Sequence, residues 1–362
     1  MKRKMLAALL VCALCLPRAN AVSAQGAVVM DADTGEVLFE QNADARLPMA
    51  STTKIMTALV ALSEGNLDRI YTVKKAYTLV EGSSMYLREG EKISLRDTLY
   101  GLLLESGNDA ALAIAGECGG LEAFVQKMNA KAAALGLKDT HFDNPNGLTS
   151  ETHYTTAREL AVIAAAAMQD PVFRQISGTQ SYTSGDHVMH NHNRLLSMYD
   201  GAISGKTGYT KAAGRCLVSA AERNGRTLVA VTLNDPNDWN DHMEMLDASF
   251  AKYEEVMLHE AGKEIAMQRV FGGNIEDVPL LAQHTIKAYV LPGELDKIET
   301  VIYGDRICYA PIAKTALAGQ VEYRLGGKAL ARDAVVYGAA SLLLPEEKNI
   351  AERILERILG SS

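Results

Sequence analysis

Cysteine is scarce in this 362-residue chain, and its few occurrences are widely spaced. Two of the five cysteines, Cys12 and Cys15, lie in an amino-terminal apolar run, so that Cys118, Cys216 and Cys308 remain in the rest of the chain. An odd number of distant thiols does not predict a disulfide framework. We expect these three residues to be buried thiols that pack as small apolar side chains.

Positive charge is also in deficit, because 36 Lys and Arg residues oppose 44 Asp and Glu residues and give a net charge of -8. An acidic chain of this kind does not predict a nucleic acid partner. The apolar content of 48% is sufficient for a sizeable core. At a typical domain size of roughly 150 residues, the length predicts two domains.

No apolar run reaches the roughly 20 residues that a membrane-spanning helix needs. The run Met5–Leu16 follows the basic stretch Lys2–Lys4 and precedes small residues that include Ala21 and Ala24. This order is typical of a secretory signal peptide, which we predict at residues 1–24 with cleavage after Ala21 or Ala24. The remaining chain is then exported. An uncleaved amino-terminal anchor is the alternative.

A metal-binding motif is missing as well, since no H-E-x-x-H occurs. His187, His190 and His192 cluster, but their Gly-, Ser- and Asn-rich setting is typical of an exposed loop. We therefore expect no metal and no cofactor. Trp239 is the single tryptophan, and a packing role is expected for it.

The pattern of the first 260 residues mixes strands with Ala- and Leu-rich helices. Short apolar runs on both sides of Asp31–Gly35 predict an opening hairpin. Strand patterns return at 216–221 and 227–233, joined by an Asn-Gly turn. Helices are predicted at 53–62, 95–118, 121–135, 156–168 and 241–261.

From Ile265 onward, short β-rich segments broken by Gly-Gly and Pro-Gly pairs predict a small all-β domain. The last segment places apolar residues on one stripe and charged residues opposite, which predicts an amphipathic helix. That helix lies either in a membrane interface or against its own domain. The expected organisation is a signal peptide at 1–24, a first domain at 25–258, a β-rich domain at 259–345 and the helix at 346–362.

Three short motifs occur in a fixed order, S-x-x-K at Ser51–Lys54, S-x-N at Ser106–Asn108 and K-T-G at Lys206–Gly208. This order is the acyl-transfer signature of penicillin-binding proteins and serine β-lactamases. A second S-x-x-K match, Ser249–Lys252, follows the other two motifs and is expected to be structural. One such match arises by chance in roughly every chain of this size.

The spacing of the first motif favours nucleophilic catalysis, because Ser51 and Lys54 share one face of a predicted helix with Cβ atoms about 5 to 6 Å apart. Lys54 can take the proton of Ser51 if burial or a second cation, such as Lys206, lowers its pKa. Ser106 is expected to relay protons from a loop between two helices. Asn108 is expected to hydrogen-bond the substrate backbone.

The K-T-G motif is predicted to bind substrate. On a strand that lines a cleft, Lys206 and Thr207 can bind a carboxylate. Gly208, which lacks a side chain, lets the substrate backbone approach closely.

With these motifs, the first domain resembles the low-molecular-weight penicillin-binding proteins that act as serine-type D-alanyl-D-alanine carboxypeptidases. The resemblance covers most of residues 25–255 and the β-rich segment after them. It extends through the segments 31–38, 83–85, 142–148, 154–158 and 191–196. It implies an α+β fold in which a helical cluster lies beside a five-stranded antiparallel sheet, with the site at their junction and a small all-β domain after it.

By that resemblance, Ser51 attacks the bond between the two terminal D-alanines of a peptidoglycan stem peptide, Lys54 is the base, and β-lactams are covalent inhibitors. The oxyanion hole would comprise the backbone N–H groups of Ser51 and of Tyr209 or Thr210. The expected place of action is the outer face of the cytoplasmic membrane, with a possible peripheral contact through the C-terminal helix.

The sequence departs from the family pattern at one point. Many relatives carry an arginine shortly before the helix that ends the first domain, whereas here the stretch is Asp238–His242. Arg194 is our candidate for binding the substrate carboxylate, with Arg215 as the other arginine for that role; otherwise Lys206 and Thr207 suffice.

Three alternative functions stay open. A class A β-lactamase would need an added glutamate, and no E-x-x-L-N run lies between the second and third motifs. A sensor that acylates without turnover is compatible with all three motifs, because acylation and deacylation differ in the placement of a water. A transpeptidase or endopeptidase acting on the same peptides is equally compatible.

Overall fold

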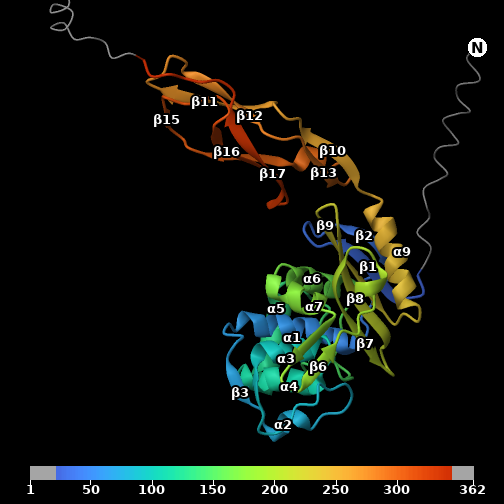
Figure 1. Ribbon diagram of the computed structural model, residues 1–362. Coiled ribbons are helices and arrows are strands. Elements are labelled where there is room, and N and C mark those ends of the chain that lie inside the picture. The colour runs from blue at the N-terminus through green and yellow to red at the C-terminus, as the bar shows by residue number, and fades with distance from the viewer. Residues whose placement is uncertain (1–21, 345–362) are drawn as a thin grey trace, which may run out of the picture. The chain divides into compact units, whose positions relative to one another are not determined.

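The computed structural model describes residues 22–344, which form two units that divide after Tyr253 (Figure 1). The predicted signal peptide and C-terminal amphipathic helix lie outside the described residues. Among residues 22–344, no helix is long and apolar enough to cross a bilayer.

The first unit is built on a five-stranded antiparallel sheet in the order β2-β1-β9-β8-β7. The central strand β9 has eight buried residues, because both of its faces are covered. The strands are β1 (Gly26–Asp31), β2 (Val37–Gln41), β7 (Ala202–Thr210), β8 (Gly214–Arg223) and β9 (Arg226–Leu233). Two short ribbons pair β3 (Ile70–Thr72) with β4 (Lys92–Ser94) and β5 (Ser181–Ser184) with β6 (His187–His190).

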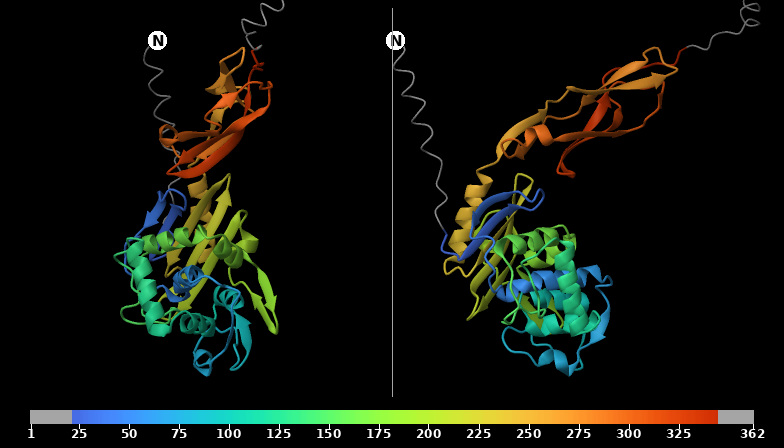
Figure 2. Two further views of the ribbon diagram at one scale, coloured as in Figure 1. Left: turned by 90° about the vertical axis from the view of Figure 1, so that its left-hand side faces the viewer. Right: turned by 180° about the vertical axis from the view of Figure 1, so that it is seen from behind.

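Helices cover the sheet on both sides, with α9 on one face and the helical cluster on the other (Figure 2). Within the cluster, α1 is buried at eight of its ten positions and forms the centre of the packing. The helices are the 3-10 turn η2 (Ala50–Thr53), α1 (Lys54–Ser63), α2 (Lys75–Thr78), α3 (Leu95–Leu103), α4 (Asn108–Glu117), α5 (Leu121–Ala134), α6 (Ala157–Met168), α7 (Pro171–Gly178), α8 (Leu195–Met198) and α9 (Asp238–Phe250).

A buried histidine fixes α9 to the sheet. His242 Nδ1 lies 2.7 Å from the Ser219 hydroxyl and Nε2 lies 3.0 Å from the Thr232 hydroxyl, so both ring nitrogens have partners. Burial lowers the pKa of His242 to about 3, and the ring is therefore neutral at physiological pH.

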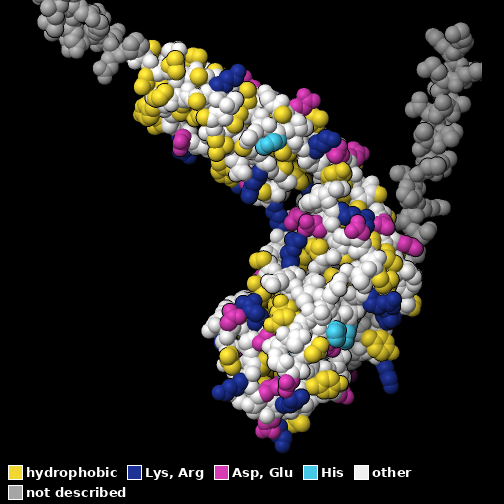
Figure 3. Space-filling model, viewed as in Figure 1, with side chains coloured by type: hydrophobic (Ala, Val, Ile, Leu, Met, Phe, Trp, Pro, Cys, Tyr) yellow, Lys and Arg dark blue, Asp and Glu magenta, His cyan; other side chains and the backbone are white. Residues whose placement is uncertain are grey.

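The second unit contains β-structure throughout its described part. Its six-stranded sheet has the order β14-β16-β17-β12-β11-β15, and β10 pairs separately with β13. Apolar side chains gather at the end formed by β11 and β15 (Figure 3), where Phe271 and Tyr309 contact each other at a ring distance of 5.9 Å. The elements are β10 (Glu254–His259), β11 (Glu264–Phe271), β12 (Asp277–Ala282), β13 (Ile286–Val290), η3 (Leu295–Lys297), β14 (Glu299–Gly304), β15 (Cys308–Tyr309), β16 (Leu317–Leu325) and β17 (Lys328–Tyr337).

The predicted α+β arrangement and the β-rich second domain are confirmed. The predicted helix at 241–261 is wrong in its second half, because α9 ends at Phe250 and β10 pairs with β13 from Glu254 onward. The expected domain boundary after residue 258 therefore falls inside β10.

Candidate active site

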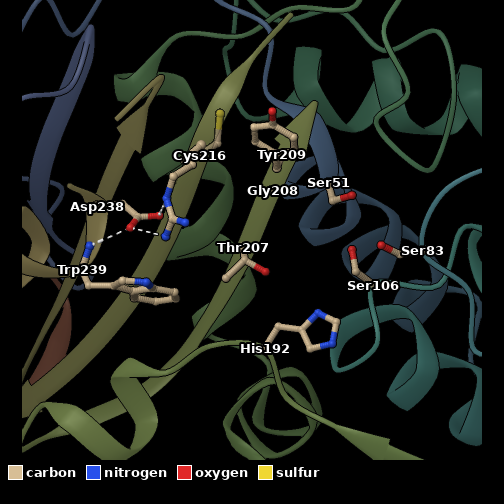
Figure 4. Close-up of a pocket in the computed structure, with 11 residues that line it drawn as sticks. Ser51, Ser83, Ser106, His192, Thr207, Gly208, Tyr209, Cys216, Asp238 and Trp239 are labelled. Carbon is tan, nitrogen blue, oxygen red and sulfur yellow. Dashed lines mark hydrogen bonds and ion pairs between the residues drawn. The ribbon is translucent and has the colours of Figure 1, made fainter. Parts of the chain in front are cut away.

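A cavity of about 550 Å³ opens at the junction of the helical cluster and the edge strand β7 (Figure 4). All three sequence motifs contribute to its wall: Ser51 from η2, Ser106 from the turn between α3 and α4, and Thr207 and Gly208 from β7. The other lining residues are Ser83, His192, Tyr209, Arg215, Cys216, Asp238 and Trp239.

Ser51 and Lys54 lie on one face of the helical start, as their spacing predicts. The Lys54 Nζ atom lies 2.9 Å from the Ser51 Oγ atom. Lys54 is fully buried, whereas Ser51 reaches the cavity. The nucleophile is thus accessible to substrate, and its base is protected from water.

The Lys54 amine has two further partners, the side-chain oxygen of Asn108 and the backbone carbonyl of Asn146, both at 2.7 Å. A protonated amine would donate to all three neighbours. A neutral amine has two N–H groups for the oxygens of Asn108 and Asn146 and one lone pair, which is left for the proton of Ser51. The geometry therefore suits a neutral base.

Burial, and secondly the charge of Lys206, lower the pKa of Lys54 well below its ordinary value, although Asp109 opposes this shift. Lys206 is itself buried, and burial lowers its pKa to about 7. Its amine donates a hydrogen bond of 2.8 Å to the Thr207 carbonyl. The lowered pKa of each lysine favours the neutral form that a general base requires.

The second motif forms the turn between α3 and α4, as predicted. Ser106 has a φ of 58°, a strained conformation for a serine, and its side chain lines the cavity. Asn108 is buried beneath it and does not line the cavity. Its side-chain nitrogen donates to the Glu81 carbonyl at 2.7 Å, and its oxygen accepts from Lys54. In this structure the Asn108 side chain contacts the predicted base, and its hydrogen bond to the substrate backbone stays a prediction.

Gly208 lies directly against the nucleophile. A Cβ atom added at Gly208 would lie 3.0 Å from the Ser51 nitrogen and 3.1 Å from the Thr52 nitrogen. A side chain at this position would separate the strand from η2. The absence of one lets the backbone of β7 approach the N–H group of Ser51.

The loop at 144–148 is a part of the site that the motif analysis did not assign. Its Asn146 carbonyl binds Lys54, and its Pro145 carbonyl accepts a hydrogen bond of 2.6 Å from Thr57 of α1. Gly147 has a φ of 86°, and an added Cβ would lie 1.9 Å from the Ala50 carbonyl oxygen. The Asn-Pro-Asn-Gly sequence signals a turn, but a turn signal does not reveal which side chain its carbonyls meet.

The two candidate arginines differ in position. Arg215 lines the cavity and forms an ion pair with Asp238. Arg194 is exposed, lies 6.0 Å from the Trp239 ring and is not among the lining residues. Lys206 is 1% exposed and is likewise absent from the lining, so Thr207 alone of that pair faces the cavity.

Of the three clustered histidines, His192 reaches the cavity. Burial lowers the pKa of His192, and the positive charge of Lys206 lowers it further. Within residues 22–344, no group of three or more His, Cys, Asp or Glu side chains is placed to hold a metal ion.

The chain matches two family models, D-alanyl-D-alanine carboxypeptidase over residues 15–237 and the penicillin-binding protein 5 C-terminal domain over residues 253–341. It is 34% identical over 328 residues to the D-alanyl-D-alanine carboxypeptidase DacF of Bacillus subtilis. The aligned region covers 86% of this chain and 84% of that relative. Penicillin-binding protein 5 of Haemophilus influenzae is similar in structure, with 30% identity, coverage of 89% of this chain and 98% of that one, and a TM-score of 0.63. A mutant of the Streptomyces K15 DD-transpeptidase matches 64% of this chain and 99% of its own at 38% identity, with a TM-score of 0.62.

Proposed function

This chain belongs to the D-alanyl-D-alanine carboxypeptidase family of serine peptidases, the low-molecular-weight penicillin-binding proteins, and from that membership we propose how its own residues carry the reaction. It is a serine-type D-Ala-D-Ala carboxypeptidase. Membership implies peptidoglycan peptides as substrates, binding of β-lactams, and action in the cell envelope outside the cytoplasm.

In the acylation step, Ser51 Oγ attacks the carbonyl carbon of the penultimate D-alanine while neutral Lys54 takes the Ser51 proton. The contact of 2.9 Å between Lys54 Nζ and Ser51 Oγ supports this assignment. The N–H group of Ser51, with that of Tyr209 beside Gly208, stabilises the oxyanion. Each such donor contributes roughly 3 kcal/mol to transition-state stabilisation.

The leaving D-alanine needs a proton on its nitrogen when the peptide bond breaks. Ser106 faces the cavity beside Ser83, on the side opposite β7, and we assign to it the relay of a proton from the lysine pair to that nitrogen. A buried Lys206 with a pKa near 7 is suited to give a proton and regain it.

Hydrolysis then releases the trimmed peptide. A water attacks the ester carbonyl and passes a proton to Lys54; as the ester C–O bond breaks, Lys54 returns that proton to Ser51 Oγ. A β-lactam forms the same kind of ester with Ser51, but its leaving nitrogen stays tethered to the acyl group and hinders the attack of water that would break the ester.

One observation carries these assignments: a buried lysine with a lowered pKa lies in hydrogen-bond contact with an accessible serine. The test is D-alanine release from a pentapeptide that ends in D-Ala-D-Ala, with mass spectrometry after exposure to penicillin. The chain offers a matched control, because Ser249 belongs to the second S-x-x-K match and is buried in α9 away from the cavity.

We expect Ser51→Ala to abolish both D-alanine release and the penicillin adduct, and Ser249→Ala to keep both. An adduct without D-alanine release by the parent protein would favour the sensor. Rapid hydrolysis of penicillin would favour a β-lactamase. Absence of any adduct on the parent would refute the serine acyl-enzyme.

The place of the enzyme within the cell envelope is also part of this proposal. We place the enzyme at the outer face of the cytoplasmic membrane, where the amphipathic segment at 346–362 would provide a peripheral contact. That segment lies outside the described residues, so the support is its sequence pattern. The test is a flotation assay with anionic vesicles that compares the full chain with a chain lacking residues 346–362. Equal vesicle binding by the two proteins would contradict the proposed contact.

A further inference from the structure

We propose that the signal peptide is removed after Ala21. The ammonium group that this cleavage creates on Val22 then provides the counter-ion for two buried carboxylates, those of Asp235 and Asp241. Neither carboxylate lines the catalytic cavity, so this site is separate from the proposed chemistry. The sequence pattern leaves cleavage after Ala21 or Ala24 open, and the contacts of residues 22–24 favour the first.

The two carboxylates form a buried acidic pair beside the start of α9. Asp235 lies in the loop between β9 and α9 and is 0% exposed, and Asp241 lies in the first turn of α9 and is 6% exposed. Asp238, the other acidic residue of that turn, forms an ion pair with Arg215. Within residues 22–344, no Lys, Arg or His side chain forms such a pair with Asp235 or Asp241. Their charge therefore lacks a side-chain counter-ion in the described part of the chain.

One oxygen of the pair has no hydrogen-bond donor. Asp235 Oδ1 accepts from the Ser23 hydroxyl at 2.5 Å and from the Asn237 N–H group at 3.0 Å, whereas the buried Oδ2 accepts from none of the described residues. Burial is the main cause of a raised pKa at Asp235. The Thr232 hydroxyl opposes this shift in pKa, but its own hydrogen-bond partner is His242 Nε2 at 3.0 Å. A buried carboxylate in this state is stabilised by a cation or by a proton.

The first described residues lie directly on this pair. The Ser23 N–H group donates to Asp241 Oδ2 at 2.6 Å, and the Ser23 hydroxyl lies 2.9 Å from the same oxygen. That hydroxyl has a single proton for two carboxylates. From β2, Gln41 Nε2 donates to the carbonyls of Val22 and Ala24 at 3.0 and 2.8 Å. Residues 22–24 are thus fixed on two sides and belong to the folded unit.

Cleavage after Ala21 places a positive charge beside the carboxylates. Hydrolysis of the Ala21–Val22 bond by a signal peptidase consumes one water and leaves a carboxylate on Ala21 and an ammonium group on Val22. The Val22 nitrogen precedes the Ser23 nitrogen by one residue, so it lies within roughly 6 Å of Asp241 Oδ2. An opposite charge at this distance favours the ionised form of a buried carboxylate.

Cleavage after Ala24 would remove these contacts. Ser23 would be lost with the signal peptide, and among the described residues Asn237 would remain as the hydrogen-bond donor to the two carboxylates. The new ammonium group on Gln25 would not replace Ser23, because the Gln25 nitrogen donates to two backbone carbonyls at and just after the end of β9, both at 3.1 Å. Val22 is therefore the better first residue for this fold.

The site of cleavage is tested by the intact mass of the protein that a bacterial host exports, together with sequencing of its amino-terminal peptide. We expect Val22 as the first residue. A chain that begins at Gln25, or one that retains residues 1–21, would overturn the proposal. This measurement does not depend on D-alanine release, so it can fail or succeed independently of the proposed function.

The counter-ion is tested with two chains released from a fusion partner without extra residues. One begins at Val22, and the other begins with two added glycines, which keep Ser23 but move the ammonium group by up to about 7 Å. Unfolding of the first unit is followed by the fluorescence of Trp239. We expect the glycines to lower the melting temperature by about 2 to 4 °C, the shift expected for loss of one partly exposed ion pair in a domain of this size.

Two variants of α9 show whether the carboxylates cause this shift. In the D241N background the added glycines should produce less than half of it, whereas E244Q, which changes an exposed acid of the same helix, should leave it intact. If D241N does not fold, D235N provides the same comparison. Glycines without effect in the parent would show that a proton neutralises the pair instead. That result, or an equal shift in D241N, would overturn the counter-ion.

Discussion

The buried charge of Lys206 leads to a prediction about stability as well as activity. Burial lowers the pKa of this lysine from an ordinary 10.5 to about 7 in the folded chain. Between these two values the unfolded chain holds a proton that the folded chain has lost. Since stability rises with pH wherever the unfolded state binds more protons, Lys206 should make the fold more stable as pH increases above 7.

The size of this effect follows from the two pKa values. At 1.36 kcal/mol for each unit, the full difference corresponds to about 5 kcal/mol, of which about 3 kcal/mol develops between pH 7 and pH 9.5. Replacement of Lys206 by Met removes this dependence. The free energy of unfolding of the parent should therefore gain about 3 kcal/mol relative to K206M across that interval.

The assay is denaturant unfolding at a series of pH values, followed by the fluorescence of Trp239, the chain's single tryptophan, which lies in the first unit. Contributions of ionisable groups that Lys206 does not affect cancel in the difference between parent and variant. The effect on Lys54 acts in the same direction as that of Lys206, because removal of the Lys206 charge raises the pKa of Lys54 in the variant. The exposed Lys211 provides a matched control, and the free energy of unfolding of K211M should change with pH in the same way as that of the parent. If the K206M and parent curves are parallel too, Lys206 does not titrate in this range and the reasoning is refuted.

Three further predictions concern single positions. Gly208→Ala should slow acylation by penicillin about tenfold or more, because its Cβ would press on the Ser51 nitrogen, whereas an unchanged rate would contradict the close approach of β7. In the form of the chain that begins after Ala21 and so retains Ser23, Ser23→Ala should lower the free energy of unfolding by about 1 to 2 kcal/mol, since the hydroxyl donates to Asp241 at 2.9 Å; a melting temperature equal to that of the parent would show that this contact is not needed. Cys216 should resist iodoacetamide at pH 8 despite its place in the cavity wall, because burial raises its pKa to about 11, and rapid alkylation seen by mass spectrometry would contradict this.

The sequence predicted those parts of the site that depend on local spacing. Ser51 and Lys54 are three residues apart on a helical start, and the hydrogen bond between them follows from that periodicity. The break in the segment 95–118 was also predictable, because Ser, Gly and Asn weaken a helix interior.

Contacts between distant segments were not predictable from the same signals. The Asn146 carbonyl meets Lys54 across 92 positions of sequence, and a backbone carbonyl leaves no mark in residue type. Arg194 and Arg215 look equivalent in the sequence, and the register of β8 decides which one reaches the cavity. The helix expected at 241–261 ends early for a similar reason, since pairing with β13 overrides the local helical pattern.

Several features that lower the stability of the first unit lie together at its active site. Lys54 and Lys206 are buried, and Ala50 and Ser106, with φ values of 48° and 58°, adopt a conformation that costs roughly 1 to 3 kcal/mol at each residue. Each feature has a chemical use: burial keeps the lysines near neutral, Ala50 precedes the nucleophile Ser51, and the turn at Ser106 directs its hydroxyl into the cavity. Substitutions that relieve these costs should raise stability and lower activity together. The buried lysine pair is the clearest instance, because the burial that destabilises the protonated form of each lysine also favours the neutral form that a base requires.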